Sequence, residues 1–265
     1  MRASSASVVA LAGAVVATAA PAAIGLTDTR MVAVPAGLYQ PFFQTRPAKG
    51  RAPVESPPMK IAAFRMDTLP VTNRQFLEFV REHPQWRRSQ IKPLFADQRY
   101  LAKWRSDLEL SDPDAASEPV TNVSWFAAEA YCEARGLRLP TTEQWDYALA
   151  DQGRDRDNIA QRSLEWFSTP TPKHLGAVGH GAPNGFGLYD MVGLVWEWTL
   201  DANSFMIGTE QRNTSSKDDA QFCGGGSVGV SNPADYPAFM RYALRTSLSA
   251  TYTVDNVGFR CAGDD

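Results

Sequence analysis

Short runs of alternating apolar and polar side chains are the first pattern along this chain, and they predict β-strands. The stretch MVAVPAGLYQPFF indicates a strand broken by a Pro-Ala-Gly turn, and PPMKIAAFRMDTLPVTN indicates a second strand that ends at Pro70. Further short strands are expected in GLVWEWTL, FCGGGSV and VGFRCAG. Strands are therefore expected toward both ends of the chain, and all of them are short.

A helical period replaces the alternation at residue 72. The hydroxyl of Thr72 can cap the free amides of a first turn, and the helix should stop before Pro84. Phe76, Phe79 and Val80 fall on one face of this helix. The pattern therefore predicts an amphipathic helix over these residues.

Two more helices are predicted in the middle of the chain. Ser124 can cap the run WFAAEAYCEAR, and Gly136 can adopt the left-handed conformation that ends it. Thr141 and Gln144 have the spacing of a capping box at the start of TTEQWDYALA. These two helices should follow each other almost directly.

The remaining segments are more irregular. Residues 85–117 are polar, and we expect a long surface excursion there with one short helix around residues 100–104. From Asp151 onward Gly, Pro, Asn and Ser are frequent, which favours long ordered loops. No fixed-period repeat is visible, which argues against solenoids and propellers.

Size and charge narrow the function classes. The chain has 265 residues, of which 44% are hydrophobic and 21% are charged, so it can bury the core of one large domain. Its formal net charge is −3, with Lys and Arg scattered along the chain. This charge pattern gives no electrostatic footprint for a nucleic acid and no polybasic patch for a membrane surface.

The N-terminal residues have the build of a secretory signal. Arg2 precedes an apolar run over residues 8–17, and small residues follow at A-x-A-like positions. The run is about half of the roughly 20 residues that a membrane-spanning helix needs, and no later segment is apolar for long enough. We therefore predict a signal peptide over residues 1–23, one domain over residues 30–265, and a periplasmic or secreted location.

The three cysteines are an odd number for an oxidising compartment. One disulfide and one remaining thiol is the simplest arrangement for Cys132, Cys223 and Cys261, and the sequence alone does not say which two pair. Cys223 precedes a run of glycines and Cys261 follows GFR. If these two strands are neighbours, a Cys223–Cys261 disulfide is the candidate pairing.

Six stretches, in order along the chain, resemble the sulfatase-modifying-factor family, to which the formylglycine-generating enzyme belongs. They are MVAVPAGLY, LPVTNRQFLEFV, PVTNVSWFAAEAYCEARGLRLPTTEQWDYA, PNGFGLYDMVGLVWEWT, GGGSV and VGFRCA. The resemblance implies an irregular α+β fold of the C-type-lectin-like kind, with short strands, two or three helices and long ordered loops. The stretch DYPAFMRYALR resembles more specifically the members of this family that accompany copper nitrite reductase.

The resemblance also shows what this chain lacks. In the family's enzyme, two cysteines after the Gly-Gly-Ser motif bind the copper ion that activates oxygen. The corresponding positions here are Val230 and residues 234–237, and none of them carries sulfur. Because soft thiolates stabilise Cu(I), we do not expect copper at the family's site.

Calcium is a second cofactor that the resemblance implies. Asn158 and Ile159 resemble the start of one of the family's calcium sites, and Glu197 keeps a suitable oxygen for a second. At the second site Leu194 replaces an Asn ligand. Because calcium takes six to eight oxygen ligands, we expect one calcium ion at most.

The residues around the lost cysteine positions form a candidate binding cleft made of Asp235, Tyr236, Arg241 and Tyr242. Arginines there can bind a carboxylate in a bidentate manner, and tyrosines add contact area. The alternative is that internal carboxylates hold the arginines. Both interpretations stay open for Arg241, whereas the structural one is favoured for Arg245.

We therefore expect an exported accessory or maturation factor that lacks the copper chemistry and serves an exported protein, such as a copper or redox enzyme, or a peptide-like metabolite. The alternative is an oxidoreductase, either of the formylglycine-generating type or a metal-dependent oxidase, that uses the same cleft with a different mechanism. A third possibility is a lectin-like binding module.

Overall fold

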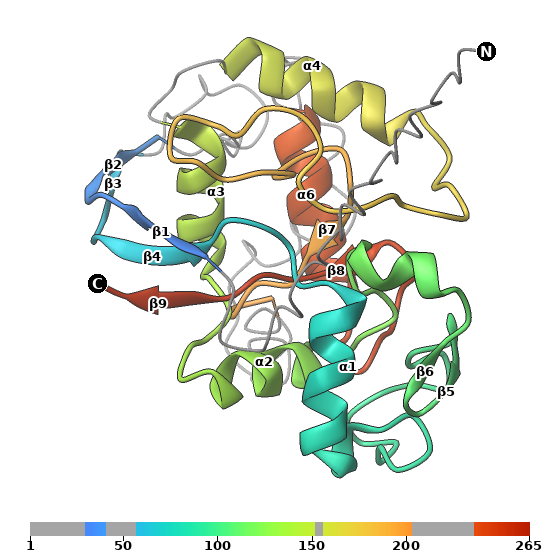
Figure 1. The fold of residues 1–265 in the computed structure, drawn as a ribbon. Helices are drawn as coiled ribbons and strands as arrows, with labels where there is room; N and C mark the ends of the chain where they lie inside the picture. Colours follow the sequence, from blue (N-terminus) through green and yellow to red (C-terminus); the bar gives the residue numbers. More distant parts are fainter. Residues whose placement is uncertain (1–29, 41–56, 152–155, 203–235) are drawn as a thin grey trace, which may run out of the picture.

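A computed structural model describes residues 30–40, 57–151, 156–202 and 236–265 (Figure 1). Its strands are β1 (Met31–Val34), β2 (Gly37–Tyr39), β3 (Met59–Ile61), β4 (Phe64–Asp67), β5 (Trp104–Ser106), β6 (Glu109–Leu110), β7 (Trp196–Glu197), β8 (Val257–Gly258) and β9 (Ala262–Asp264). Its α-helices are α1 (Asn73–Glu82), α2 (Trp125–Ala134), α3 (Thr142–Ala150), α4 (Arg156–Phe167) and α6 (Tyr236–Ser247). Two short 3₁₀-helices are η1 (Pro84–Trp86) and η2 (Pro113–Ser117).

The strands form small sheets, so the irregular α+β fold is confirmed. The three-stranded sheet has the order β1-β4-β9 and is antiparallel, which places strands from the two ends of the domain side by side. The pairs β2–β3 and β5–β6 are antiparallel, and β7 and β8 are parallel. None of these strands is longer than four residues, so helices and ordered loops complete the core.

The predicted helix starts are confirmed, because the capping side chains make the expected hydrogen bonds. Thr72 and Gln75 form a capping box at α1, and Thr141 and Gln144 form another at α3. The Ser124 hydroxyl accepts the backbone amide of Ala127 at the start of α2. These local contacts satisfy amides that the helix itself leaves free.

Two secondary-structure predictions are wrong. The expected short helix around residues 100–104 is a turn followed by β5, because Leu101 has a left-handed φ of 48° and its amide donates to Asn122 of another segment. A long loop is present after Asp151 as expected, over residues 168–195, but the segment also contains helices α4 and α6, which were not expected. Tertiary contacts decide both segments. Leu101 is hydrogen-bonded to Asn122, and α4 and α6 pack against each other.

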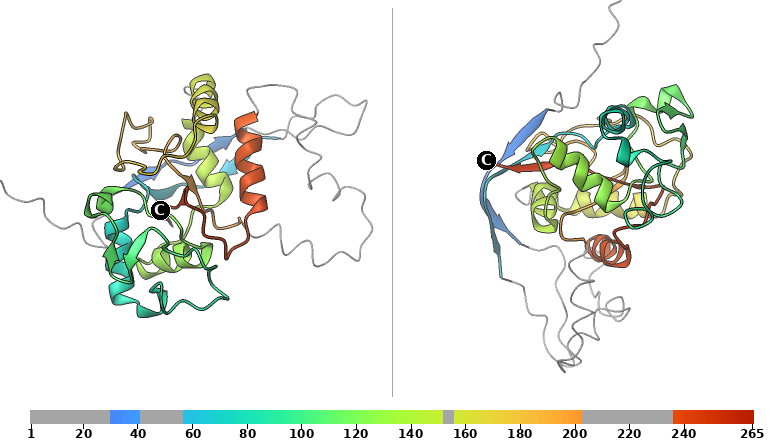
Figure 2. Two further views of the ribbon diagram at one scale, coloured as in Figure 1. Left: turned by 90° about the vertical axis from the view of Figure 1, so that its right-hand side faces the viewer. Right: turned by 90° about the horizontal axis from the view of Figure 1, so that it is seen from below.

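Two apolar clusters make up the core. The first lies around α1 and α2 and includes Phe76, Tyr131 and Phe259. The second lies between the β1-β4-β9 sheet and α3 and includes Phe64 and Trp145. Figures 1 and 2 show α1 and α2 in one half of the molecule and α3, α4 and α6 in the other.

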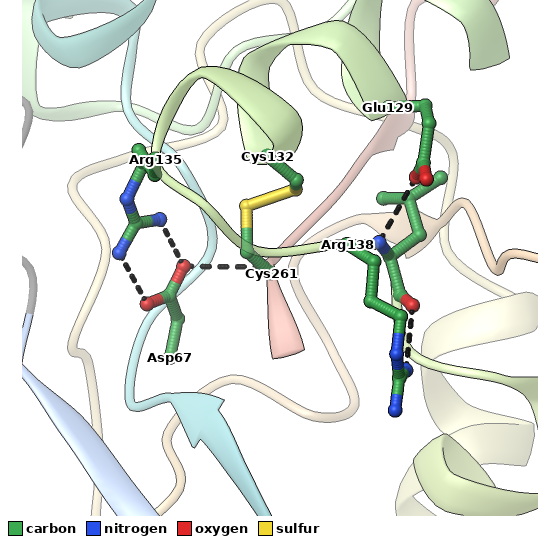
Figure 3. Close-up of a disulfide and its surroundings, with 7 residues drawn as sticks. Asp67, Glu129, Cys132, Arg135, Arg138 and Cys261 are labelled. Atoms are coloured by element: carbon green, nitrogen blue, oxygen red, sulfur yellow. Dashed lines mark hydrogen bonds and ion pairs between the residues drawn. A yellow bond between two sulfur atoms is a disulfide. The ribbon is translucent and has the colours of Figure 1, made fainter. Parts of the chain in front are cut away.

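A disulfide joins Cys132 of α2 to Cys261, with the two Cα atoms 5.5 Å apart (Figure 3). The predicted Cys223–Cys261 pairing is therefore wrong, because Cys261 is bonded to Cys132. The reason is the β-bridge between Arg138 and Ala262, which holds the chain after α2 against the C-terminal strand. Cys223 lies outside the described residues.

Among the described residues, we find no helix that is both long enough and apolar enough to cross a membrane. The predicted signal peptide lies outside these residues, so export remains a prediction.

Candidate binding site at helix α6

Helix α6 carries the described part of the predicted cleft. Tyr236, its first residue, is 42% exposed. Asp235 and the side chain of Tyr242 lie outside the described residues, as do Val230 and residue 234 at the lost copper positions. The helix packs beside α4 and close to α3 (Figures 1 and 2). Tyr236 is therefore the described residue of the predicted cleft that a partner can reach.

Arg241 and Arg245 lie one turn apart on α6, and both are buried. The Nε atom of Arg241 is 3.5 Å from Oδ1 of Asp146 in α3, and Nη1 of Arg245 is 3.4 Å from the same oxygen. Burial lowers the pKa of the Arg241 guanidinium, the Asp146 carboxylate opposes this shift, and Arg245 adds to it. Asp146 is therefore an internal carboxylate partner of both arginines. This agrees with the interpretation that the arginines have a structural role.

A chain of polar contacts continues from Arg245 into the core. Its guanidinium carbon lies 4.7 Å from the centre of the Trp145 ring, within the range of a cation–π contact. The indole Nε1 of Trp145 donates to Oε2 of Glu197 over 2.7 Å. The Glu197 carboxylate also accepts hydrogen bonds from the buried Arg260. The arginines of α6 are thus linked through α3 to β7 and the C-terminal segment.

Two of the predicted calcium ligands, Glu197 and Ile159, already make hydrogen bonds to protein groups. Both carboxylate oxygens of Glu197 already accept bonds from protein groups. Asn158 is exposed in the first turn of α4, and the carbonyl oxygen of the buried Ile159 accepts a hydrogen bond of 2.7 Å from the Ser163 hydroxyl. No group of three or more His, Cys, Asp or Glu side chains within the described ranges is arranged to hold a metal ion. Calcium stays a prediction.

An aromatic cluster on α4 and β7 borders the buried arginines. Trp166 and Phe167 both pack on Trp196, with ring centres 4.8 Å apart in each pair. The cavity between these rings and α6 has a volume of about 10 Å³, enough for about one water molecule. Among the described residues, this cavity is therefore too small for a ligand larger than water.

Sequence reasoning missed Asp146, Trp166 and Phe167 as parts of this region. The run QWDYA gives a weak signal for Asp146, because it places one acidic residue between aromatic positions of a core helix. The two aromatic residues at the end of α4 gave no signal, because their segment was assigned to a loop.

The cysteines decide whether this chain can provide two thiolate ligands for a metal ion. Cys132 and Cys261 are fully buried and bonded to each other, so their sulfur atoms cannot serve as thiolate ligands. The chain has three cysteines in all, which leaves the sulfur of Cys223 alone. A single chain therefore cannot supply two thiolates to one ion while this disulfide is intact.

Comparison with known families identifies the class to which this protein belongs. The model of the "Sulfatase-modifying factor enzyme 1-like domain" family matches residues 17–265, and the chain belongs to this family. Formylglycine-generating enzyme from Mus musculus is 29% identical over an alignment that covers 90% of this chain and 76% of that protein. Inactive C-alpha-formylglycine-generating enzyme 2 from Bos taurus is 28% identical, with 88% of this chain and 87% of that protein covered. Hercynine oxygenase from Mycobacterium tuberculosis is 30% identical over 52% of this chain and 38% of that protein.

Proposed function

We propose that this protein is an exported accessory or maturation factor that acts without the two-thiolate copper chemistry of the formylglycine-generating enzyme. The observation that carries the proposal is the Cys132–Cys261 disulfide, which leaves Cys223 as the one cysteine of the chain outside this bridge. Without a second thiolate, the linear sulfur pair that suits Cu(I) cannot form. A bovine relative that is named inactive supports the same conclusion.

The proposed client is an exported protein, such as a copper or redox enzyme, or a peptide-like metabolite. The client contacts α6 at Tyr236, because this aromatic side chain is exposed at the start of the helix. Tyrosine is enriched in binding hot spots, since it offers a large contact area and a hydroxyl. Arg241 and Arg245, further along α6, hold this helix against α3 through their ion pairs with Asp146.

The test is an assay for formylglycine. The mature protein is incubated with a cysteine-containing sulfatase-type peptide, copper and oxygen, and the peptide mass is measured. We expect the cysteine to remain unchanged, with a formylglycine-generating enzyme as the positive control. Conversion to the aldehyde with repeated turnover would refute the proposal.

A second candidate function is an oxidoreductase with a different mechanism, which the match to hercynine oxygenase favours. Metal analysis of the purified protein separates the two candidates. One equivalent of iron or copper, together with oxygen consumption when a substrate is added, would support the oxidoreductase. Metal-free protein that captures one client from a periplasmic extract would support the accessory factor.

Export is part of the proposal and has its own test. The N-terminal sequence of the mature protein should begin between about residues 20 and 24, as expected after signal-peptide processing. Recovery of the intact chain, with Met1, from the cytosol would contradict export.

A further inference from the structure

A tight turn between α1 and β5 displays a leucine at the surface, in the half of the molecule opposite α4 (Figure 1). The turn runs from Lys92 to Phe95, and the Phe95 amide donates to the Lys92 carbonyl over 2.9 Å. Pro93 is at the second position, which proline favours because its ring fixes φ. Leu94, at the third position, is 72% exposed. This is the largest exposed fraction of any large hydrophobic residue that the structure describes.

Aromatic rings and backbone hydrogen bonds hold the base of this turn. The ring centre of Phe95 is 5.8 Å from that of Trp86 and 5.5 Å from that of Phe126 in α2. Two residues after the turn, the amide of Asp97 donates to the carbonyl of Thr251 over 2.8 Å. A turn that is fixed in this way needs little ordering when it binds, so its leucine is preorganised for contact.

A tyrosine and a tryptophan lie beside the turn. Tyr252 is 48% exposed and stands between Thr251 and Thr253, which are both hydrogen-bonded to Asp97. Trp86, which packs on the turn, is half-buried. Tyrosine and tryptophan are enriched where membranes meet water, because their rings are amphipathic.

Basic residues are concentrated in the same segment. Residues 86–103 contain a single carboxylate, that of Asp97, and five basic side chains, which belong to Arg87, Arg88, Lys92, Arg99 and Lys103. The guanidinium groups of Arg87 and Arg88 donate to the backbone carbonyls of Val80 and Trp104. A neutral carbonyl accepts such a hydrogen bond without cancelling the positive charge.

The neighbouring carboxylates do not balance this charge. Asp107 accepts hydrogen bonds from Ser89, and Asp255 lies close to Lys103. With Asp97 they make three negative side chains against five positive ones, a net charge of +2, whereas the whole chain has a net charge of −3. The charge of the whole chain did not indicate this local excess, which attracts anionic surfaces.

The shape of the turn indicates which anionic surface fits. Lys92, Pro93 and Leu94 are exposed one after another, so the turn projects from the protein as a convex tip. A fluid surface closes around such a tip, whereas a protein partner needs a matching pocket. An apolar tip with cationic neighbours is also the composition of elements that lie in the membrane interface.

We propose that this turn docks the protein on the surface of a membrane that contains anionic lipids. Leu94 enters the boundary between headgroups and acyl chains, while Lys92 and Arg99 stay at the headgroups. The turn contacts one leaflet and does not span the bilayer. Binding is reversible and depends on salt, because one apolar side chain and a few cations make a weak anchor. This inference does not rest on the client surface at α6.

The test measures binding of the full-length mature protein to vesicles by co-sedimentation. One set of vesicles contains phosphatidylglycerol and phosphatidylcholine in about equal parts, and the other contains phosphatidylcholine alone. We expect a partition coefficient at least about tenfold higher for the anionic vesicles, since each cation near the surface adds to the attraction. Raising sodium chloride from about 0.05 M to about 0.5 M should remove most of this difference.

Variants of the turn separate apolar insertion from charge. Leu94→Ser should weaken binding to the anionic vesicles about tenfold without changing any charge, whereas Leu94→Phe should keep it. Lys92→Glu with Arg99→Glu should weaken it at least about tenfold. Leu94→Phe and the charge variant keep the test decisive even if serine disturbs the turn, and thermal melts show whether each variant is folded.

Matched controls change the same properties elsewhere on the surface. Leu38→Ser removes another leucine that is 65% exposed, on β2. Lys60→Glu with Arg162→Glu changes the net charge by the same amount at exposed positions on β3 and α4. Both controls should bind the anionic vesicles within about twofold of the wild type, as expected for surface positions outside the contact.

Three results would overturn the proposal. The first is equal partition into the two kinds of vesicle, and the second is an equal loss of binding in the turn variants and their controls. The third is self-association of the wild-type protein that Leu94→Ser abolishes while vesicles do not bind, because a second copy would then cover the turn.

Discussion

Two arginine–aspartate sites in this molecule are built differently. Beside the disulfide, the buried Asp67 accepts hydrogen bonds of 2.6 and 2.8 Å from Arg135 and a third of 3.1 Å from the Cys261 amide (Figure 3). One negative group here faces one guanidinium in a bidentate arrangement, which is the strong form of this contact.

At α6 a single carboxylate serves two guanidinium groups. Asp146 is 3.4 Å from Arg245 and 3.5 Å from Arg241, and its side chain is 18% exposed. The contacts are longer than at Asp67, and the three side chains together carry one positive charge.

This difference separates a region that holds the fold from one that should tolerate the loss of a single arginine. Breaking a balanced pair whose carboxylate is fully buried leaves a charge that the interior solvates poorly. Removing one of two arginines from a shared carboxylate still leaves that carboxylate paired. We therefore expect mutations near the disulfide to affect stability first, and mutations at the surface of α6 to affect binding first.

The largest expected effect comes from the disulfide. Cys132→Ser with Cys261→Ser opens a loop of 129 residues, and the chain-entropy relation predicts a loss of about 5 kcal/mol in the free energy of unfolding. Urea denaturation measures the loss. Cys223→Ser is the control and should leave the denaturation midpoint unchanged, and an equal loss in this control would contradict the pairing.

Asp67→Ala should be nearly as damaging. It leaves Arg135 as an unpaired buried charge, which typically costs about 3 to 5 kcal/mol. The matched control is Glu109→Ala, which breaks an exposed Arg–Glu pair and should cost less than about 1 kcal/mol. Similar unfolding free energies for the two variants would show that the buried pair does not hold the fold.

Arg245→Ala should have a moderate effect on stability. The change removes the contact with Trp145 and one ion pair, but Asp146 keeps Arg241, so we expect a loss of about 1 to 2 kcal/mol. Arg162→Ala, at an exposed position on α4, is the control and should stay within about 0.5 kcal/mol of the wild type. A loss as large as that of Asp67→Ala would remove the distinction between the two sites.

Tyr236→Ala should change stability least. Its side chain is 42% exposed, so the melting temperature should stay close to the wild-type value. Binding of a client captured by pull-down should weaken by more than about 1 kcal/mol if Tyr236 is a hot spot. Normal client binding together with a lowered melting temperature would show that Tyr236 belongs to the core.

The local signals in the sequence determined the starts of helices α1, α2 and α3 and most of the short strands. Caps such as Thr72 and Ser124 work through contacts with their own helix, so their effect needs no knowledge of the rest of the chain. The cysteine count and the missing sulfur at Val230 also follow from the sequence. With the six motifs they indicate the family and predict that its copper site is absent.

Only the tertiary structure decided the disulfide partner of Cys261 and the carboxylate that holds the α6 arginines. Cys132 and Cys261 are 129 positions apart, and Asp146 and Arg245 are 99 apart, so no local spacing links them. The turn at Leu101 and helices α4 and α6 were missed for the same reason. Packing and hydrogen bonds between distant segments outweighed the weak local preferences of these residues.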